Sequence, residues 1–226
     1  MKKFMQVPYE LSLSQKIFTS SYYAFNALNN PERGDLVAAL GDVTGFKAGQ
    51  NLVKRMKLSE NGRYLLKNKP IISKNTLNFN SLQNFPEGSL GKSYYEYMIE
   101  YNFDTDERPT VQFIQDPNVA YAILRYRQVH DFWHILCDLP PSLLGEIALK
   151  WFEWRHTGLP SCAMSALVGP IKLSTSDRYT LKQRYIPWAN EAATTCQDLL
   201  SVHYEENLDK QVNDLRNELN LKVIRV

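Results

Sequence analysis

The chain has 226 residues, of which 44% are hydrophobic and 12% aromatic, and these are enough for one domain with a substantial core. Its formal net charge of +2 comes from basic and acidic residues mixed along the sequence, so a nucleic-acid partner is not expected. It contains no run of about 18 apolar residues, the length that a helix needs to cross a bilayer. Three separated cysteines, Cys137, Cys162 and Cys196, favour a reduced compartment over a disulfide scaffold.

Residues 1–8 have neither the long apolar run of a secretory signal nor the Arg- and Ser-rich pattern of a transit peptide. We therefore expect either a bacterial protein or one from which a targeting segment has been removed.

Most of the N-terminal half has the apolar spacing of helices. The predicted helical segments are Ser14–Asn29, Arg33–Leu40, Gln50–Lys67 and Tyr94–Asn102. Asn30-Pro31 ends the first of them, and residues 41–45 are predicted as a turn-rich stretch. Residues 68–93, rich in Asn, Ser, Pro and Gly, are predicted as a long ordered loop region, and Val111–Ile114 is the candidate extended segment.

Two helices joined by a short link are predicted in the middle of the chain. Asp116-Pro117 has the pattern of an N-cap followed by a proline in the first turn, and it opens a helix that runs toward Cys137. Leu139-Pro140-Pro141 ends this helix, because proline cannot continue the backbone hydrogen bonds. Ser142 is the expected N-cap of a second helix over Leu143–Thr157. So short a link predicts an antiparallel helix hairpin.

The last third of the chain is also predicted to be helical. Ser161–Leu173 is small and apolar, and it suits either a core helix or the lining of a groove for a long hydrocarbon. A long helix is predicted over Asp177–Asn207 with a bend at Ile186-Pro187, and an amphipathic segment over Leu208–Leu221. Because we find no internal repeat or flexible linker, residues 1–226 are expected to form a single domain, a mostly α helical bundle with a long loop region.

The pattern His-Asp-x-x-His followed by Glu146 carries the most chemical information. His130 and His134 share one helix face, and Asp131, three residues before His134, can join them. The link between the two helices is centred near Pro140. At ~1.5 Å rise per residue, His134 and Glu146 both lie about 9 Å from that bend, so facing helices should bring them together. His130, Asp131, His134 and Glu146 are therefore the candidate metal ligands.

Two imidazoles and carboxylates suit zinc, with iron(II), manganese or magnesium as alternatives. A metal of this kind polarises a substrate oxygen or activates water. Two simpler interpretations stay open: Asp131 orients an imidazole instead of binding metal, and Glu146 pairs with Lys150 one turn later. His156 and His203 have no acidic cluster at ligand spacing, so they are interpreted as structural.

The motif argues against two classes of metal enzyme. Zinc proteases use a Glu directly after the first His as general base, whereas Asp131 is shorter and places a base poorly. Phosphohydrolases of the HD superfamily need a further His well upstream, and no His precedes His130.

Several blocks of the sequence, in order over roughly residues 12–220, resemble the Coq-four family of ubiquinone (coenzyme Q) biosynthesis. The blocks are Asn30-Pro31 through Asp35, Ala39–Gly45, Phe85–Gly91, Arg125–Arg127, the histidine motif, Leu144–Glu146 with Thr157–Pro160, Gly169–Ile171 and Ile186–Ala189. The resemblance implies a mostly helical fold and a metal, usually taken as zinc, at the four candidate ligands. It also implies action on a polyprenylated 4-hydroxybenzoate intermediate, as a metal-dependent lyase that decarboxylates ring carbon 1, with replacement of the carboxyl group by hydroxyl considered part of the role.

For location and partners, the resemblance implies a peripheral membrane protein that works with other quinone-biosynthetic enzymes. In a eukaryote, the membrane would be the mitochondrial inner membrane, with the protein on its matrix side. In a bacterium, we expect a cytoplasmic protein at the membrane surface. The apolar Ser161–Leu173 segment and the tyrosine-rich helices would accommodate the prenyl tail of a lipid ligand.

Three hypotheses follow. The first is a decarboxylase in which Arg125, Arg127 or Lys150 helps to hold the substrate. The second is a non-catalytic prenyl-lipid-binding scaffold that organises a quinone-biosynthetic enzyme complex around a structural metal, and the third is an oxygen-using iron enzyme. A closed four-ligand site favours the scaffold, and an open coordination position favours an enzyme. A homodimer through the aromatic helices is expected, because one small domain covers little of a long isoprenoid. The tyrosines and phenylalanine considered for this contact are Tyr22, Tyr23, Phe25, Tyr94, Tyr95 and Tyr97.

Overall fold

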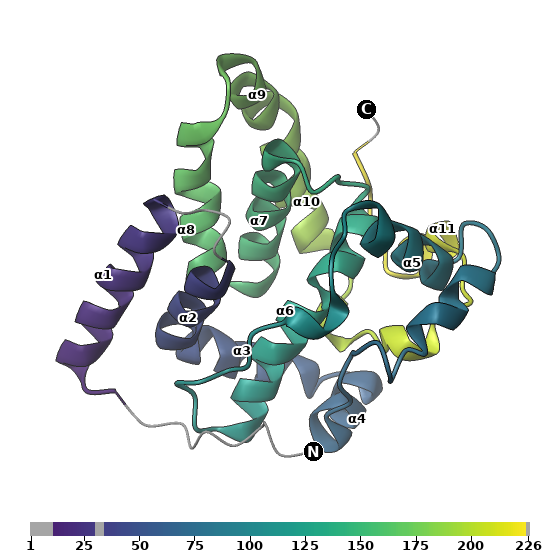
Figure 1. The fold of residues 1–226 in the computed structure, drawn as a ribbon, viewed down its shortest axis with the longest axis horizontal. Helices are drawn as coiled ribbons and strands as arrows, with labels where there is room; N and C mark the ends of the chain where they lie inside the picture. Colours follow the sequence, from purple (N-terminus) through teal and green to yellow (C-terminus); the bar gives the residue numbers. More distant parts are fainter. Residues whose placement is uncertain (1–10, 30–33, 225–226) are drawn as a thin grey trace.

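The computed structural model describes residues 11–29 and 34–224. In this part the backbone is mostly helical, with one isolated bridge between Ser89 and Gln211 and no strand (Figure 1). The first helices are α1 (Leu13–Asn29), α2 (Gly34–Thr44), α3 (Phe46–Met56), α4 (Glu60–Asn68) and α5 (Leu90–Glu100). The later ones are α6 (Pro117–Cys137), α7 (Leu143–Thr157), α8 (Pro160–Val168), α9 (Thr175–Thr180), α10 (Ile186–Thr195) and α11 (Val212–Glu218). The mostly α, single-domain class is confirmed.

The bounds of α6 and α7 follow from local sequence. The Asp116 side chain accepts hydrogen bonds from the first turn of α6, and Pro117 starts that turn. Asp138 ends α6 in the left-handed conformation, at φ 57°, which short polar side chains tolerate. Ser142 caps α7, and Gly158 at φ 72° ends it. The two helices therefore begin and end as predicted, with a five-residue link over 138–142.

Helix α6 is the centre of the fold, because α3, α5 and α7 all pack against it. Figure 1 shows α1, α2 and α8 on one side of the α6–α7 pair, and α5 and α11 on the other. The side chains of Phe132 and Trp133 are fully buried, and Phe132 stacks between Tyr94 of α5 and Tyr204. Burial of this many large aromatic side chains fixes α6, and so fixes the position of its two histidines.

Two predicted helices are wrong in extent. The segment Gln50–Lys67 is divided between α3 and α4, because Ser59 caps a new helix after a turn at 57–59. The long helix over Asp177–Asn207 does not form. α9 continues into a π-helical turn at Leu181–Tyr185, α10 ends at Thr195, and the chain then turns back so that several apolar side chains enter the core. These side chains are Leu199, Leu200 and Tyr204, each with 0% exposure.

Other elements also differ from expectation. The predicted turn at Gly41 lies inside α2, where a Cβ would come 3.2 Å from Oγ of Ser161, so the glycine allows α2 and α8 to approach closely. Val111–Ile114 is not part of a strand. The loop region over 68–93 is confirmed, apart from a 3-10 turn at Phe79–Asn84 and the start of α5 at Leu90. The predictions for 1–8 and for Asn30-Pro31 lie outside the described residues.

The segment Ser161–Leu173 is buried along only part of its length, and its predicted role in lining a groove for a hydrocarbon stays a prediction. Cys162, Ala166 and Leu173 are buried, whereas Leu167 and Ile171 are exposed. The segment is therefore partly core and partly apolar surface.

Candidate metal centre

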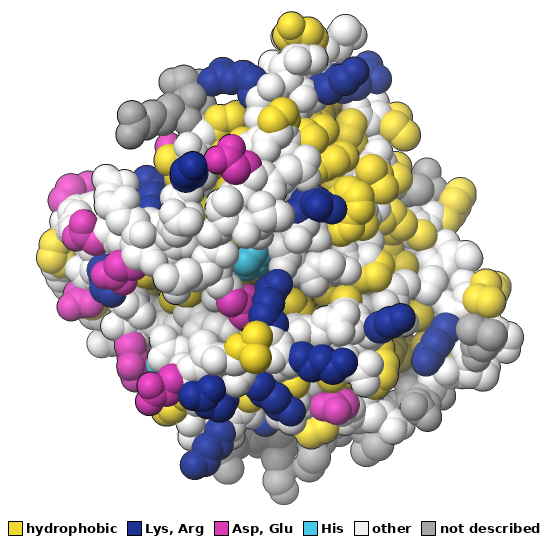
Figure 2. All heavy atoms as spheres, turned by 180° about the vertical axis from the view of Figure 1, so that it is seen from behind, with side chains coloured by type: hydrophobic (Ala, Val, Ile, Leu, Met, Phe, Trp, Pro, Cys, Tyr) yellow, Lys and Arg dark blue, Asp and Glu magenta, His cyan; other side chains and the backbone are white. Residues whose placement is uncertain are grey.

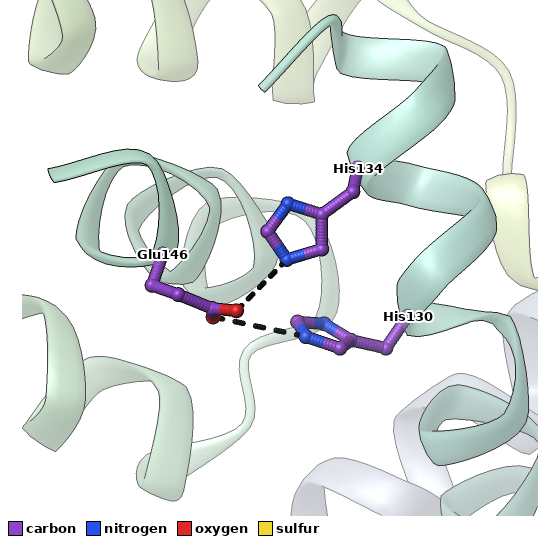
Figure 3. A group of neighbouring side chains, drawn as sticks. All are labelled: His130, His134 and Glu146. Atoms are coloured by element: carbon purple, nitrogen blue, oxygen red, sulfur yellow. Dashed lines mark hydrogen bonds and ion pairs between the residues drawn. The ribbon is translucent and has the colours of Figure 1, made fainter. Parts of the chain in front are cut away.

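Two imidazoles and a carboxylate converge between α6 and α7. Nε2 of His134 lies 3.1 Å from Oε1 of Glu146, and Nε2 of His130 lies 3.7 Å from Oε2 of the same carboxylate. Ligand atoms of all three residues fall within 4.8 Å of one another. Figure 3 shows the two rings projecting from successive turns of α6 toward Glu146, which projects from α7 to meet them. The structure thus brings together three of the four residues predicted as ligands.

The second nitrogen of each ring is held by an acceptor. Nδ1 of His130 lies 2.6 Å from Oε1 of Glu153, and Nδ1 of His134 lies 3.0 Å from the Leu139 carbonyl oxygen. A carbonyl oxygen and an ionised carboxylate only accept, so each Nδ1 carries the hydrogen. In a neutral ring this leaves Nε2 with its lone pair turned toward Glu146, which is the tautomer that binds metal.

The charge states also suit a metal. Burial, together with the Lys150 ammonium, lowers the pKa of His130 to about 4, so this ring is neutral at pH 7. Burial alone would raise the pKa of Glu146, but the facing histidines and Lys150 outweigh it and lower that pKa to about 2. The lone pair on Nε2 of the neutral His130 ring therefore faces an ionised carboxylate oxygen at 3.7 Å, a contact that a cation between them would stabilise. Two nitrogen donors and one oxygen donor fit a divalent ion such as zinc.

Asp131 is not part of this group. Its carboxylate is 4% exposed and forms an ion pair with Arg108. Successive residues of an α-helix point about 100° apart, so Asp131 leaves the face that carries His130. Its role as a fourth ligand stays a prediction.

Glu153 was not predicted as a site residue, and neither was its network. Its carboxylate is completely buried and accepts hydrogen bonds from His130, from Nζ of Lys150 at 2.7 Å and from the hydroxyl of Tyr126 at 2.7 Å. Lys150 therefore pairs with Glu153 and not with Glu146, the pairing considered from sequence. The signal was present: Glu146, Lys150 and Glu153 recur at the i, i+4, i+7 spacing of one helix face.

The two other histidines make contacts outside this group. His156 is buried, donates from Nδ1 to the Ala193 carbonyl and accepts the Leu199 N–H at Nε2. His203 packs against the ring of Tyr64. These contacts agree with the structural roles predicted for both.

A cavity of about 130 Å³ adjoins His130. Its apolar wall comes from α2, α6 and α8, and three cationic residues, Arg108, Arg127 and Lys150, also line it. A cavity of about 150 Å³ can hold one benzene ring, so this space is of the order of a single aromatic ring. On the face shown in Figure 2, a histidine is visible near the middle with acidic and basic side chains beside it, and hydrophobic side chains gather to one side.

The sequence profile of the family "Coenzyme Q (ubiquinone) biosynthesis protein Coq4" matches residues 6–225. This chain belongs to the Coq4 family. Its general role is therefore in ubiquinone biosynthesis.

Individual Coq4 relatives are similar in sequence to this chain over most of its length. A protein named ubiquinone biosynthesis protein COQ4 homolog, mitochondrial, from Aedes aegypti is 36% identical over 100% of this chain and 82% of its own length. The protein of the same name from Bos taurus is 39% identical over 93% of this chain and 79% of its own. A crystal structure described as that of a ubiquinone biosynthesis protein from Nostoc punctiforme has the same fold, with a TM-score of 0.70 and 20% identity, over 90% of this chain and 97% of that one.

These names place several Coq4 relatives in mitochondria. Within 11–29 and 34–224, none of the helices combines the length and apolar character needed to cross a bilayer.

Proposed function

We propose that this Coq4 chain is a metal-dependent carbon–carbon lyase that decarboxylates ring carbon 1 of a polyprenylated 4-hydroxybenzoate, of the 4-hydroxy-3-methoxy-5-polyprenylbenzoate type. One observation supports this proposal above the others. The imidazoles of His130 and His134 and the carboxylate of Glu146 converge, and His130 also lines a cavity with the size of one aromatic ring.

In this proposal, His130, His134 and Glu146 hold a divalent ion, with zinc as the first choice and iron, manganese or magnesium as alternatives. When bound, such an ion supplies a positive charge that stabilises the electron density left on the ring as carbon dioxide departs. Glu153 and the Leu139 carbonyl keep both rings in the orientation that the site needs. The apolar cavity wall excludes water from the ring of the substrate.

The number of ligands favours an enzyme over a purely structural site. Three protein donors leave coordination positions open, as in catalytic zinc sites, whereas structural zinc sites are closed by four protein ligands.

The test measures carbon dioxide release from a prenylated 4-hydroxybenzoate by His130→Ala and Glu146→Ala, with metal content determined in parallel. We expect a loss of at least about 100-fold in turnover together with loss of the metal, because a ligand is removed. His203→Ala, outside the group, is the matched control and should keep both. Full turnover by either ligand variant would exclude this site.

The same assay distinguishes the oxygen-using alternative. Simple decarboxylation leaves hydrogen at ring carbon 1 and does not need oxygen. The oxygen-using iron enzyme would instead give a product with a hydroxyl group at that carbon, depend on oxygen and contain a redox-active metal.

The non-catalytic scaffold is the second candidate, and exposed apolar residues favour it. Ile17, Phe18 and Tyr22 of α1 are 55–75% exposed, and Ile171 is 73% exposed. Such surfaces suit a lipid or a protein partner. A scaffold would retain a prenyl lipid in native mass spectrometry but release no carbon dioxide.

For this chain we propose peripheral membrane association, partnership with other quinone-biosynthetic enzymes and a homodimer. The membrane would be the matrix side of the mitochondrial inner membrane in a eukaryote, or the cytoplasmic membrane surface in a bacterium.

A further inference from the structure

Lys150 lies in the wall shared by the metal centre and the cavity. Its Nζ is 2.7 Å from Oε2 of Glu153, 3.2 Å from the Tyr126 hydroxyl and 3.5 Å from Nδ1 of His130. The side chain is 18% exposed and lines the cavity. A nearly buried ammonium group therefore faces both the ligands and the space beside them.

The hydrogen bonds of this ammonium are incomplete. An ammonium group has three N–H donors, and Glu153 and the Tyr126 oxygen accept two of them. Nδ1 of His130 cannot accept the third, because its own hydrogen is donated to Glu153 at 2.6 Å. Among the contacts of the described residues, the third N–H of Lys150 has no acceptor, and the cavity is the space that it adjoins.

Arg127 also lines the cavity, but its donors are already used. It donates to the carbonyl oxygens of Pro109, Thr110 and Ala38 and forms a buried ion pair with Asp42. With four acceptors around one guanidinium group, it has little capacity left for a ligand.

The two other candidate cations are less suitable. Arg125 is 0% exposed, forms a two-bond pair with Glu205 and does not line the cavity. Arg108 lines the cavity and forms an ion pair with the buried Asp131. Lys150 is the cation that combines a spare donor with direct contact to a candidate ligand.

We propose that Lys150 binds the carboxylate of an aromatic acid in this cavity, with the ring of the acid against the apolar wall. The identity of the acid rests on the proposed function, but the anchor itself does not depend on turnover. Glu153 is the positioning residue, because it holds Lys150 and His130 by opposite oxygens of one carboxylate.

The test is equilibrium binding at pH 7 in the presence of EDTA, so that a metal does not contribute. The probes are 3-geranyl-4-hydroxybenzoate and its methyl ester, which differ only in the charge of the head group. The full chain should bind the acid at least tenfold more tightly than the ester. In Lys150→Met this preference should disappear through weaker binding of the acid, with the affinity for the ester unchanged.

Further variants keep the test decisive. Lys150→Met leaves the buried Glu153 without its counter-charge, so the double variant Lys150→Met/Glu153→Gln removes both charges and should also lose the preference. Glu153→Gln alone keeps the ammonium and should retain it. Lys54→Met, at an exposed position of α3, is the matched control, and thermal unfolding checks that each variant is folded.

Equal affinity of the unmodified chain for acid and ester, or no binding of the acid, would overturn the proposal. So would a preference that survives in the folded Lys150 variants and is lost in Arg108→Met, which would make Arg108 the anchor. Carbon dioxide release is measured separately. If the chain prefers the acid through Lys150 but releases no carbon dioxide, the decarboxylase is contradicted and the Lys150 anchor is supported. If it releases carbon dioxide but shows no preference for the acid over the ester, the anchor is contradicted and the decarboxylase is supported.

Discussion

Glu153 has the largest number of roles of any single residue at the centre. Burial alone would raise its pKa, but Lys150 and His130 hold that pKa well below its usual range, so the carboxylate is ionised. One oxygen fixes the tautomer of His130, and the other holds Lys150 and Tyr126. Carboxylates that hold a ligating histidine in this way orient the ring and raise its basicity.

Glu153→Ala should lower the metal affinity by about 10- to 100-fold, because the Nδ1–H of His130 loses its acceptor. Glu153→Gln should keep most of the affinity, since the amide oxygen still accepts this hydrogen. Metal titration against a chelator measures both, with the exposed Glu218→Ala as control. Equal affinities in the two Glu153 variants would contradict the positioning role.

The burial of His156 makes the stability of the fold depend on pH. Burial, with the nearby Arg55, lowers the pKa of His156 to about 4 from 6.5. Between these values the unfolded chain binds a proton that the folded protein excludes, so stability falls as the pH drops from 6.5 toward 4.

Replacement of His156 by Gln removes this proton-linked term. The difference in the free energy of unfolding between wild type and His156→Gln should therefore shrink by about 2 kcal/mol from pH 7 to pH 5. Urea unfolding at the two pH values measures it. A difference that stays constant would show that His156 titrates alike in both states.

At the scale of the helices, the number of residues between a side chain and the link of the hairpin determines which side chains of α6 and α7 meet. Equal distances from Pro140 predicted that His134 and Glu146 meet, and they do. The same rule applied one turn further pairs His130 with Lys150, and their side chains lie 3.5 Å apart. The contacts of His130 and His134 with Glu146 and Lys150 are therefore readable from one motif and one short link.

Gly145 sets the start of α7 and, with it, the position of Glu146. A Cβ at this position would lie 2.0 Å from the carbonyl oxygen of Pro140 in the link. Gly145→Ala should destabilise the fold by about 2 kcal/mol, because the clash is with backbone, and it should weaken metal binding by displacing Glu146.

Gly158→Ala, at the other end of α7, is the matched control. An alanine held at the left-handed φ of 72° found here should lower the free energy of unfolding by about 1 kcal/mol, with no effect on metal affinity. Thermal unfolding and metal titration of the two variants separate these effects, and unchanged metal binding in a folded Gly145→Ala would contradict the geometric role of the link.

At the scale of the whole molecule, the structure narrows the expected dimer contact. Tyr94 and Tyr97 of α5 are buried in the core, and Tyr97 stacks on the ring of His134. Among the aromatic residues considered for this contact, the exposed ones are Tyr22 and Phe25 of α1, at 55% and 67%, and Phe18 of the same helix is 75% exposed. An interface built on the aromatic helices therefore has to use α1.

We expect a particle of twice the chain mass in light scattering at micromolar concentration, since burial of these side chains stabilises association. Phe18→Ser combined with Tyr22→Ser should shift it to a monomer without loss of helical content. The replacement of exposed Tyr179 by Ser is the control. A wild-type chain that is strictly monomeric would contradict the proposal.

The sequence by itself determined the helical class, the bounds of α6 and α7, and the meeting of His130, His134 and Glu146. These features depend on caps, prolines and helical spacing, which act within one or two turns. Only the tertiary structure decided that the segment Asp177–Asn207 is divided into shorter helices, that Asp131 pairs with Arg108, and that Glu153 joins His130 to Lys150. The reason is physical: each of these depends on which distant side chains compete for the same buried space or the same charge, and local sequence does not record that competition.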